Sequence, residues 1–207
     1  MPAGTSRMIA AVAPSRRSLS LRLLRRLARQ ECGIAAVEFS LILPILVMLW
    51  IGGVEITQAL SVDRRLNNLA SATGDLVARS KIVTWADVDN IFDIAPGALF
   101  PYSIGGLQMR VTAVKMDEAG DAEVAWSRAE GTTAYATSTD VNDLVPESLR
   151  VPDTQIIMAE VGYTYTPAVG YVITGDLDLG DRMFFVPRLV ANVQLCESNP
   201  PATNCQS

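Results

Sequence analysis

The sequence contains no histidine at any of its 207 positions. This absence removes the side chain most used for acid–base catalysis near neutral pH, and the commonest transition-metal ligand. The chain also lacks a Gly-x-Ser-x-Gly nucleophile turn, a phosphate-binding loop, a dinucleotide-binding glycine pattern and a Cys-x-x-Cys pair. We therefore expect a protein that is not an enzyme, with no cofactor, no metal and no small-molecule substrate.

Negatively charged residues are absent from the first 30 positions of the chain. Residues 1–30 carry seven arginines and no acid, whereas residues 56–207 carry ten basic and nineteen acidic residues, a net charge of −9. Phosphate binding requires at least a basic patch, so the acidic C-terminal part argues against a nucleic-acid partner.

A long apolar run separates these two parts. Sixteen residues lie between Glu38 and Glu55, and Ser40 carries the only hydroxyl among them. With the apolar flanks Ile34–Val37 and Ile56, the run reaches the roughly 20 residues that cross a bilayer as a helix. Arginines beside such a helix stay on the cytoplasmic side. The pattern therefore predicts a cytoplasmic N-terminus and an exported C-terminal domain.

Two targeting signals compete with this interpretation. The arginine- and serine-rich, acid-free start is typical of a mitochondrial transit peptide, and Thr57-Gln58-Ala59 satisfies the small-x-small rule for secretory cleavage after Ala59. The apolar part of a signal peptide usually has about 7–15 residues, and this run is longer and contains Pro44. A membrane helix therefore fits better.

The chain has three cysteines, whose positions agree with this topology. Cys32 falls on the cytoplasmic side, where thiols stay reduced, while Cys196 and Cys205 lie close together in the exported tail. We expect the two exported cysteines to form a bridge that closes a short loop, with two free thiols as the alternative.

Helical periodicity continues beyond the apolar run. Apolar or small side chains recur at helical spacing at Val62, Leu66, Leu69, Thr73, Leu76 and Val77. The helix should therefore continue to about Arg79. Thr84 predicts the N-cap of a second helix over Trp85–Ile94, which Pro96-Gly97 should end.

Strand signals follow these helices. Leu107–Met116 and Ala122–Arg128 predict a hairpin, and Gln155–Tyr165 and Met183–Leu195 predict two further strands. A short helix near Val141–Leu144 is a further candidate. Four strands beside a long helix predict an α+β domain with a small antiparallel sheet.

One acidic cluster, Asp176–Asp181, is a candidate cation site. A calcium loop of the EF-hand kind needs glycine at its sixth position and glutamate at its twelfth, but Gly180 is fifth and Pro187 twelfth. We interpret the cluster as a solvated acidic turn, with weak calcium binding as the alternative.

The start of the apolar run has a recognisable pattern. Gly33 is followed by four residues, then Glu38, the aromatic Phe39 and the apolar run. This arrangement resembles the processing site of type IV prepilins. The sequence of residues 33–44 resembles the start of TadE-like minor pseudopilins of the tight-adherence (Flp-type) pilus assembly system. It reads Gly-Ile-Ala-Ala-Val-Glu-Phe-Ser-Leu-Ile-Leu-Pro.

The resemblance implies a pilin-like fold, with the long helix packed on the sheet, and three segments. Residues 1–33 would be a cytoplasmic leader, residues 34–60 a transmembrane helix and residues 61–207 the extracytoplasmic domain. A prepilin peptidase would cut after Gly33 and leave Ile34 with a free α-amine. The helix would then be free to bundle with others, bent at Pro44.

The resemblance also implies a place and partners. The protein would lie in the bacterial inner membrane, with other pilins and pseudopilins, the peptidase and the pilus assembly platform as partners. Glu38 would pair with the α-ammonium of Ile34, on the same or a neighbouring subunit, because an unpaired charge within the bilayer is costly. Phe39 and Pro44 would share in this assembly region.

For Glu55, at the other membrane interface, we prefer the interpretation of a hydrated carboxylate without a specific role. The alternative function is an uncleaved single-pass membrane protein whose outer domain senses a ligand or binds a partner.

Overall fold

The structure is a computed structural model that describes residues 32–167, 170, 174–197 and 204–206. The expected leader, except for its last two residues, lies outside this part. The chain divides into two compact units, Met1–Trp50 and Ile51–Ser207, and each is described by itself.

The first helix, α2, spans Cys32–Ala78, with Pro44 inside it. Its sequence is rich in leucine, isoleucine and alanine, and hydroxyl side chains bond back to the helix's own carbonyl groups. Thr57 Oγ1 donates to the carbonyl of Gly53 at 2.7 Å, and Ser61 Oγ donates to the carbonyl of Thr57 at 2.7 Å. The predicted helix is therefore confirmed to within a residue of its expected end.

A four-stranded sheet dominates the second unit. Its strands are β2 (Leu107–Met116), β3 (Ala122–Glu130), β4 (Gln155–Tyr165) and β5 (Leu177–Phe185). They follow the order β3-β2-β4-β5, and every neighbouring pair is antiparallel. The predicted α+β fold, a long helix with a small antiparallel sheet, is confirmed.

The fourth strand is not where the sequence analysis placed it. The predicted strand Met183–Leu195 is wrong, because β5 ends at Phe185 and the short strand β6 (Gln194–Cys196) pairs in parallel with β1 (Ile82–Thr84) instead. Pro187 has no N–H to continue the ladder, and beyond it the Arg188 N–H donates to the carbonyl of Ala78 at the end of α2.

The interpretation of Asp176–Asp181 as an acidic turn is also wrong for most of its length. Asp178 and Asp181 lie within β5, opposite Thr164 and Val161 of β4. The Asp178 carboxylate accepts a hydrogen bond from Thr164 Oγ1 at 2.9 Å, so this acid is accommodated on the polar face of a strand.

The second helix, α3, spans Trp85–Leu99. Thr84 forms the predicted N-cap, since its Oγ1 accepts from the Asp87 N–H at 3.1 Å and the Asp87 carboxylate accepts from the Thr84 N–H at 2.9 Å. The predicted end at Ile94 is wrong, because the helix continues through Pro96-Gly97. Its last turn is held by tertiary packing, with Leu99 fully buried in the core.

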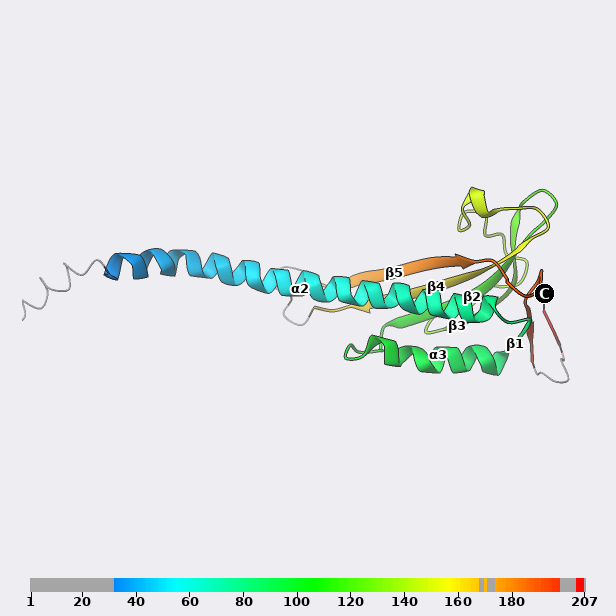
Figure 1. The fold of residues 1–207 in the computed structure, drawn as a ribbon, viewed down its shortest axis with the longest axis horizontal. Helices are drawn as coiled ribbons and strands as arrows, with labels where there is room; N and C mark the ends of the chain where they lie inside the picture. The colour runs from blue at the N-terminus through cyan, green and yellow to red at the C-terminus, as the bar shows by residue number, and fades with distance from the viewer. Residues whose placement is uncertain (1–31, 168–169, 171–173, 198–203, 207) are drawn as a thin grey trace, which may run out of the picture. The chain divides into compact units, whose positions relative to one another are not determined.

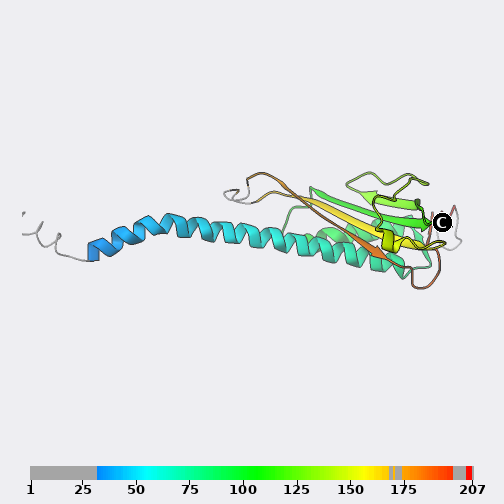
Figure 2. The ribbon, with the colours of Figure 1, turned by 90° about the horizontal axis from the view of Figure 1, so that it is seen from above.

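Within the second unit, the α2 residues from Ile51 onward and α3 lie side by side on one face of the sheet (Figure 1 and Figure 2). Of the predicted core positions on α2, Val62, Leu66 and Val77 are almost completely buried, but Leu76 is 53% exposed, so its assignment to the core is wrong. Gly74 faces the Phe185 ring, which leaves no room there for a larger side chain.

In the segment between β5 and β6, both the N–H and the carbonyl group of Val193 are hydrogen-bonded to core side chains. Trp126 is fully buried, and its Nε1–H donates to the carbonyl of Val193 at 2.9 Å. The Val193 N–H in turn donates to Oε1 of the buried Gln155 at 2.6 Å. One residue of an otherwise irregular segment thus has both backbone groups satisfied inside the core.

The other face of the sheet is covered at one end. Val114, Val124 and Met158 pack there beneath Val141 and Val145 of the connection between β3 and β4. The helix considered at Val141–Leu144 is absent from this described segment, which instead has a turn followed by a single 3₁₀ turn at Glu147–Leu149.

Candidate functional site

The residues of the expected processing site lie in the first turns of α2. Gly33 and Glu38 are five residues apart, which on a helix is an axial rise of about 7.5 Å. Ile34 is 63% exposed and Phe39 58% exposed. A Cβ added at Gly33 would meet nothing within 4 Å. The segment is therefore open to a second protein from every side that the structure describes.

In this uncleaved chain the nitrogen of Ile34 is a peptide nitrogen, so it carries no charge. Glu38 is exposed as well. Any pairing of its carboxylate with an α-ammonium requires cleavage after Gly33 first, because only cleavage creates that charge. The expected charge pairing at Glu38 therefore depends on processing at Gly33, which must come first.

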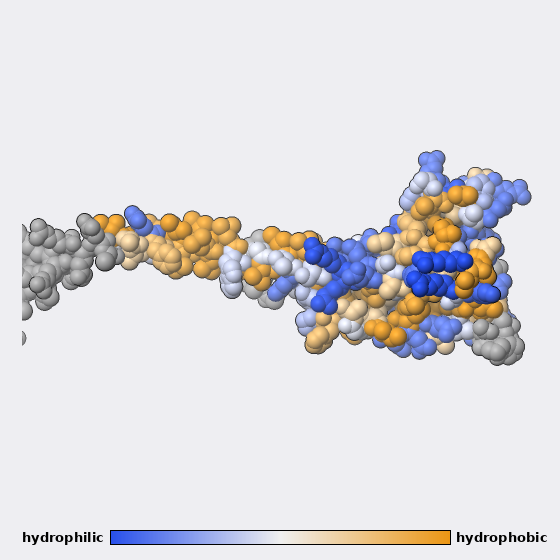
Figure 3. Space-filling model, in the orientation of Figure 1, coloured by the Kyte–Doolittle hydropathy of each residue, from blue (hydrophilic) through white to orange (hydrophobic). Residues whose placement is uncertain are grey.

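The surface of α2 that follows is almost entirely apolar. The helix contains a window with mean hydropathy 2.4, of which no part is buried, and by length and composition it is long enough to cross a membrane. The apolar stretch is the continuous orange region of the helix in Figure 3. The Ser40 hydroxyl donates to the carbonyl of Val37 at 2.8 Å, so it exposes little unpaired polarity. Between residues 33 and 54, Glu38 is the one ionisable side chain.

Exposed apolar surface of this extent is unfavourable in water. A bilayer or the apolar surfaces of partner helices would cover it. Together with a disulfide-containing C-terminal domain, the helix is consistent with membrane anchoring and an extracytoplasmic domain. Pro44 lies within the helix without ending it, as expected where packing or lipid compensates for its missing N–H.

Glu55 differs from its expected state. It is 2% exposed, so the interpretation as a hydrated carboxylate at the interface is wrong. It lies near Tyr165, whose ring contacts Tyr102 edge-on at 6.2 Å and whose hydroxyl donates to Oε1 of Gln58 at 3.2 Å. Burial raises the pKa of Tyr165, and nearby Tyr102 and Glu55 raise it further. Periodicity could have indicated this burial, since Glu55 lies one turn before Ala59 and two before Val62 on the packed stripe of the helix.

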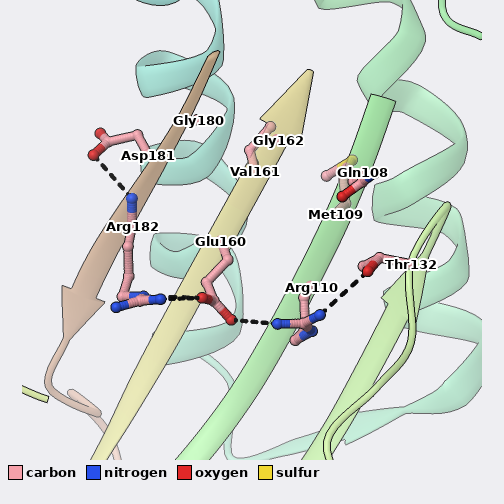
Figure 4. Close-up of a pocket in the computed structure, with 10 residues that line it drawn as sticks. All are labelled: Gln108, Met109, Arg110, Thr132, Glu160, Val161, Gly162, Gly180, Asp181 and Arg182. Carbon is pink, nitrogen blue, oxygen red and sulfur yellow. Dashed lines mark hydrogen bonds and ion pairs between the residues drawn. The ribbon is translucent and has the colours of Figure 1, made fainter. Parts of the chain in front are cut away.

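A row of charges that the sequence did not reveal lies on the sheet face away from the helices, partly covered by the connection between β3 and β4. Arg110, Glu160 and Arg182 lie side by side on β2, β4 and β5 (Figure 4). Arg110 Nη1 donates to Glu160 Oε2 at 3.0 Å, and Arg182 Nε donates to Oε1 at 2.9 Å. The Arg110 guanidinium also lies 4.0 Å from the centroid of the Tyr135 ring.

A shallow cavity of about 360 Å³ opens beside this row. Gly162 and Gly180 form a cross-strand pair and leave a gap in the side-chain layer, which Gln108 and Thr132 border. Cross-strand ion pairs of this kind stabilise the sheet and fix its register. No local signal points to the row, because its members are far apart in the sequence.

Cys196 and Cys205 form the predicted disulfide. It closes a loop at the C-terminal end of the chain, where the backbone of Gln206 also pairs with Leu195. The bridge therefore links Cys205 to β6. Val193, next to β6, is in turn hydrogen-bonded to Trp126 and Gln155 in the core.

The described residues contain no cluster of three or more His, Cys, Asp or Glu side chains that could hold a metal ion, and Asp176–Asp181 is no exception. Asp176 and Asp178 instead accept hydrogen bonds from threonines of the neighbouring segment, at 2.6 and 2.9 Å.

Comparison with known proteins identifies one region. A family model described as "TadE-like protein" matches residues 33–75, which begin at the expected processing site and run through the packed part of α2. No curated protein and no solved structure matches the chain.

Proposed function

We propose that this chain, whose residues 33–75 match the model of TadE-like proteins, is a non-enzymatic minor pseudopilin that serves the biogenesis of a tight-adherence pilus. The observation that supports the proposal most strongly is that one helix has an exposed apolar part followed by a part that is buried in a domain. The same α2 begins as an exposed apolar cylinder and continues as the buried spine of an α+β domain. The family match covers both parts.

The proposed sequence of events begins at the cytoplasmic face of the inner membrane. A prepilin peptidase cuts the peptide bond after Gly33, where the absence of a side chain permits close backbone access. Removal of residues 1–33 takes away all seven arginines of the leader, which otherwise hold the helix in place. Within the expected span of residues 34–60, the exposed apolar part of the helix then crosses the bilayer, while Glu55, Gln58 and Ala59 at its outer end pack on the domain that folds outside.

Cleavage also creates the α-ammonium of Ile34. The Glu38 carboxylate, the only other ionisable group in the apolar stretch, is about one turn away along the helix. An ion pair between the two, within one subunit or between neighbours, greatly lowers the cost of carrying either charge into lipid. Pairing between neighbours would set the axial register of bundled helices, with Phe39 and Pro44 shaping the same contact region.

The proposed partners are other pilins and pseudopilins, which bundle through α2, together with the peptidase and the assembly platform of the inner membrane. The disulfide supports an oxidising compartment for the outer domain.

Two substitutions test the proposal in the native organism. Replacing Gly33 with leucine should block processing and leave a product that is about 33 residues heavier on a gel, roughly 3.6 kDa at the average residue mass of a chain of 207 residues and 22.3 kDa. Gly53→Leu is the matched control, because Gly53 is another α2 glycine with open space around it, and it should leave processing unchanged. Unchanged mobility of Gly33→Leu would contradict processing and favour the uncleaved single-pass protein.

The second substitution separates the role of the carboxylate from processing. Glu38→Ala should still be cut but should abolish pilus assembly, whereas Glu38→Asp should retain part of it. Normal piliation by Glu38→Ala would remove the proposed ion pair.

A further inference from the structure

Two cavities of the second unit adjoin each other. The cavity of about 360 Å³ beside the row of charges and a larger one of about 740 Å³ share Gln108 in their walls. Thr132 of the first cavity follows Gly131 of the second, and Gly162 of the first precedes Thr164 of the second by two residues, on the same face of β4. Both volumes lie in the range of about 300–1,000 Å³ that is typical of small-molecule sites. We call the smaller cavity the charged hollow and the larger one the neutral hollow.

The floor of the charged hollow contains a glycine that the packing of the chain does not require. A Cβ added at Gly162 would lie 3.6 Å from Gln108 Oε1 and 3.7 Å from Gln108 Cβ, which are ordinary contact distances, and the φ of Gly162 is not positive. Its partner Gly180 differs, because a Cβ there would lie 3.0 Å from the carbonyl oxygen of Val161. Glycine inside a strand lowers stability and often marks a place where a ligand approaches closely. Gly162 therefore keeps open a floor that the fold itself could have filled.

The row of charges supplies hydrogen-bond donors beside this floor. A guanidinium has five N–H donors. Arg110 donates through three nitrogens, to Glu160, Thr132 and a backbone carbonyl, and Arg182 donates through three nitrogens, to Glu160 and a backbone carbonyl. Five less three leaves two N–H groups on each arginine without a partner among the described residues. The side chains of Arg110 and Arg182 are only 17% and 35% exposed, so these donors are held in place.

The charged hollow also has an excess of positive charge. Arg110 and Arg182 share the single carboxylate of Glu160. Asp181 points away from β4 in Figure 4, and its carboxylate accepts from the backbone N–H of Arg182 at 2.8 Å. The chain around the hollow is acidic, with a net charge of −9 over residues 56–207. The hollow is therefore a local exception that suits the carboxylate of a ligand, since a guanidinium matches this group in charge and geometry.

The neutral hollow has a different lining. Among the described residues that line it there is no Asp, Glu, Lys or Arg, whereas hydroxyl groups are frequent. Tyr102 and Tyr163 both contribute to the wall. Tyr163 is 7% exposed, yet its hydroxyl has no hydrogen bond to any described residue. A buried hydroxyl without a partner is costly, so a ligand that bonds to it is favoured. This lining suits a neutral molecule that is rich in hydroxyl groups.

An extended peptide does not suit the same surface. Over Glu160–Gly162, β4 is paired with β2 on one side and with β5 on the other, so its main-chain groups are occupied and cannot pair with an added strand. Recognition must therefore use side chains. Gln108, Thr132 and Thr164 can each both donate and accept hydrogen bonds, as the hydroxyl groups of sugars do.

We propose that the two hollows together bind an acidic oligosaccharide. The carboxylate of one sugar lies in the charged hollow, where it accepts the unused N–H groups of Arg110 and Arg182. The adjoining neutral sugar lies in the neutral hollow, against Tyr102 and Tyr163, and Gln108 bonds to both sugars. This binding does not rest on the pseudopilin function or on cleavage after Gly33, so each proposal can fail without the other.

Isothermal titration calorimetry tests the proposal on the full-length chain in a polyoxyethylene detergent, which has neither a sugar nor a charge. A short hyaluronan oligosaccharide, in which acidic and neutral sugars alternate, should bind saturably. A chitin oligosaccharide of the same length has no carboxylate and should bind about tenfold more weakly, the scale of hydrogen bonds to a charged group. Oligoglutamate, which has carboxylates but no sugar, should show no binding.

One substitution fills the charged hollow and leaves the row of charges intact. Gly162→Val should weaken hyaluronan binding by at least about tenfold, and it should not lower Tm, because valine is favoured in strands. Lys115→Val is the matched control, since it places the same side chain at an exposed position of β2 outside both hollows and also removes a cation. Its affinity for hyaluronan should equal that of the parent.

A second substitution separates the role of charge from a general loss of structure. Arg182→Gln should lower the affinity for hyaluronan to that of the chitin oligosaccharide and leave the affinity for chitin unchanged. An equal loss of both would contradict the assigned role of Arg182. Failure of the parent to bind hyaluronan, equal binding of oligoglutamate, or unchanged binding by Gly162→Val would each overturn the proposed site.

Discussion

Two helical glycines should respond in opposite directions to the same substitution. Gly97 is exposed in α3, and a Cβ added there would meet nothing within 4 Å. Alanine is favoured over glycine inside a helix by about 1 kcal/mol. Gly97→Ala should therefore stabilise the second unit, Ile51–Ser207, by about that amount, which for a domain of this size raises Tm by about 2–4 °C.

Gly74 lies where α2 crosses the sheet. A Cβ there would overlap the ring of Phe185 and lie 3.2 Å from Cβ of Ala159. The helix-propensity gain is the same, but overpacking a well-filled core costs about 1–3 kcal/mol. Gly74→Ala should therefore be neutral to about 2 kcal/mol destabilising, which leaves a gap of about 1–3 kcal/mol between the two variants.

Thermal unfolding of the full-length chain in detergent, followed by circular dichroism, measures both variants against the parent. A double-mutant cycle with Phe185→Leu assigns the cause, because a smaller side chain at 185 should recover part of the loss caused by Gly74→Ala. If both alanine variants shifted Tm upward by the same amount, the close crossing of α2 over β5 would be refuted.

Three further predictions concern the same domain. Thr84→Ala removes the capping box of α3 and should destabilise by about 1 kcal/mol, measured by urea unfolding; a change below a few tenths would contradict the cap. Trp126→Phe leaves the carbonyl of Val193 without its donor and should cost about 1–3 kcal/mol, with faster amide exchange at Val193 than at the centre of β2 as the specific sign. Burial raises the pKa of Tyr163 and Tyr165 above 10.0 in the folded state, so these tyrosines ionise more readily in the unfolded chain. The stabilisation that these two tyrosines contribute should therefore be constant below pH 10 and be lost as the pH rises through the raised folded values, and Tyr163→Phe should reduce that loss in a series of urea titrations.

Sequence periodicity and local chemistry were sufficient for the elements with strong local signals. α2 has an uninterrupted apolar and then amphipathic pattern, α3 begins at a threonine with an aspartate three residues later, and the hairpin β2–β3 has a turn with Asp117 and Gly120. In each case the residues that form the element are neighbours in the sequence, so the signal is present before any tertiary contact.

The errors have a common physical origin in contacts between distant residues. β5 contains two aspartates and a glycine, which locally favour a turn, yet Thr164 on β4 supplies a hydrogen-bond partner to Asp178. α3 continues past Pro96 because Arg65 on α2 donates to the carbonyls of Ala98 and Phe100, at 3.0 and 3.1 Å. Neither partner is visible from the local sequence.

The residues of the candidate site also differ in whether the sequence alone could reveal them. The pattern from Gly33 through Glu38 could be recognised in the sequence, because its residues are neighbours along the chain. The row Arg110, Glu160 and Arg182 could not be read, since only strand register brings its members together. Burial of Glu55 lies between these cases, since its helical face could be predicted but not the residues that contact it.

The central claim is that this chain becomes functional when a peptidase removes its arginine-rich leader. N-terminal sequencing of the protein isolated from its native membrane tests this most directly. The account predicts a mature chain that begins at Ile34. A chain that begins at Met1 or Met8 while pili form normally, or a soluble product that begins at Leu60, would contradict it.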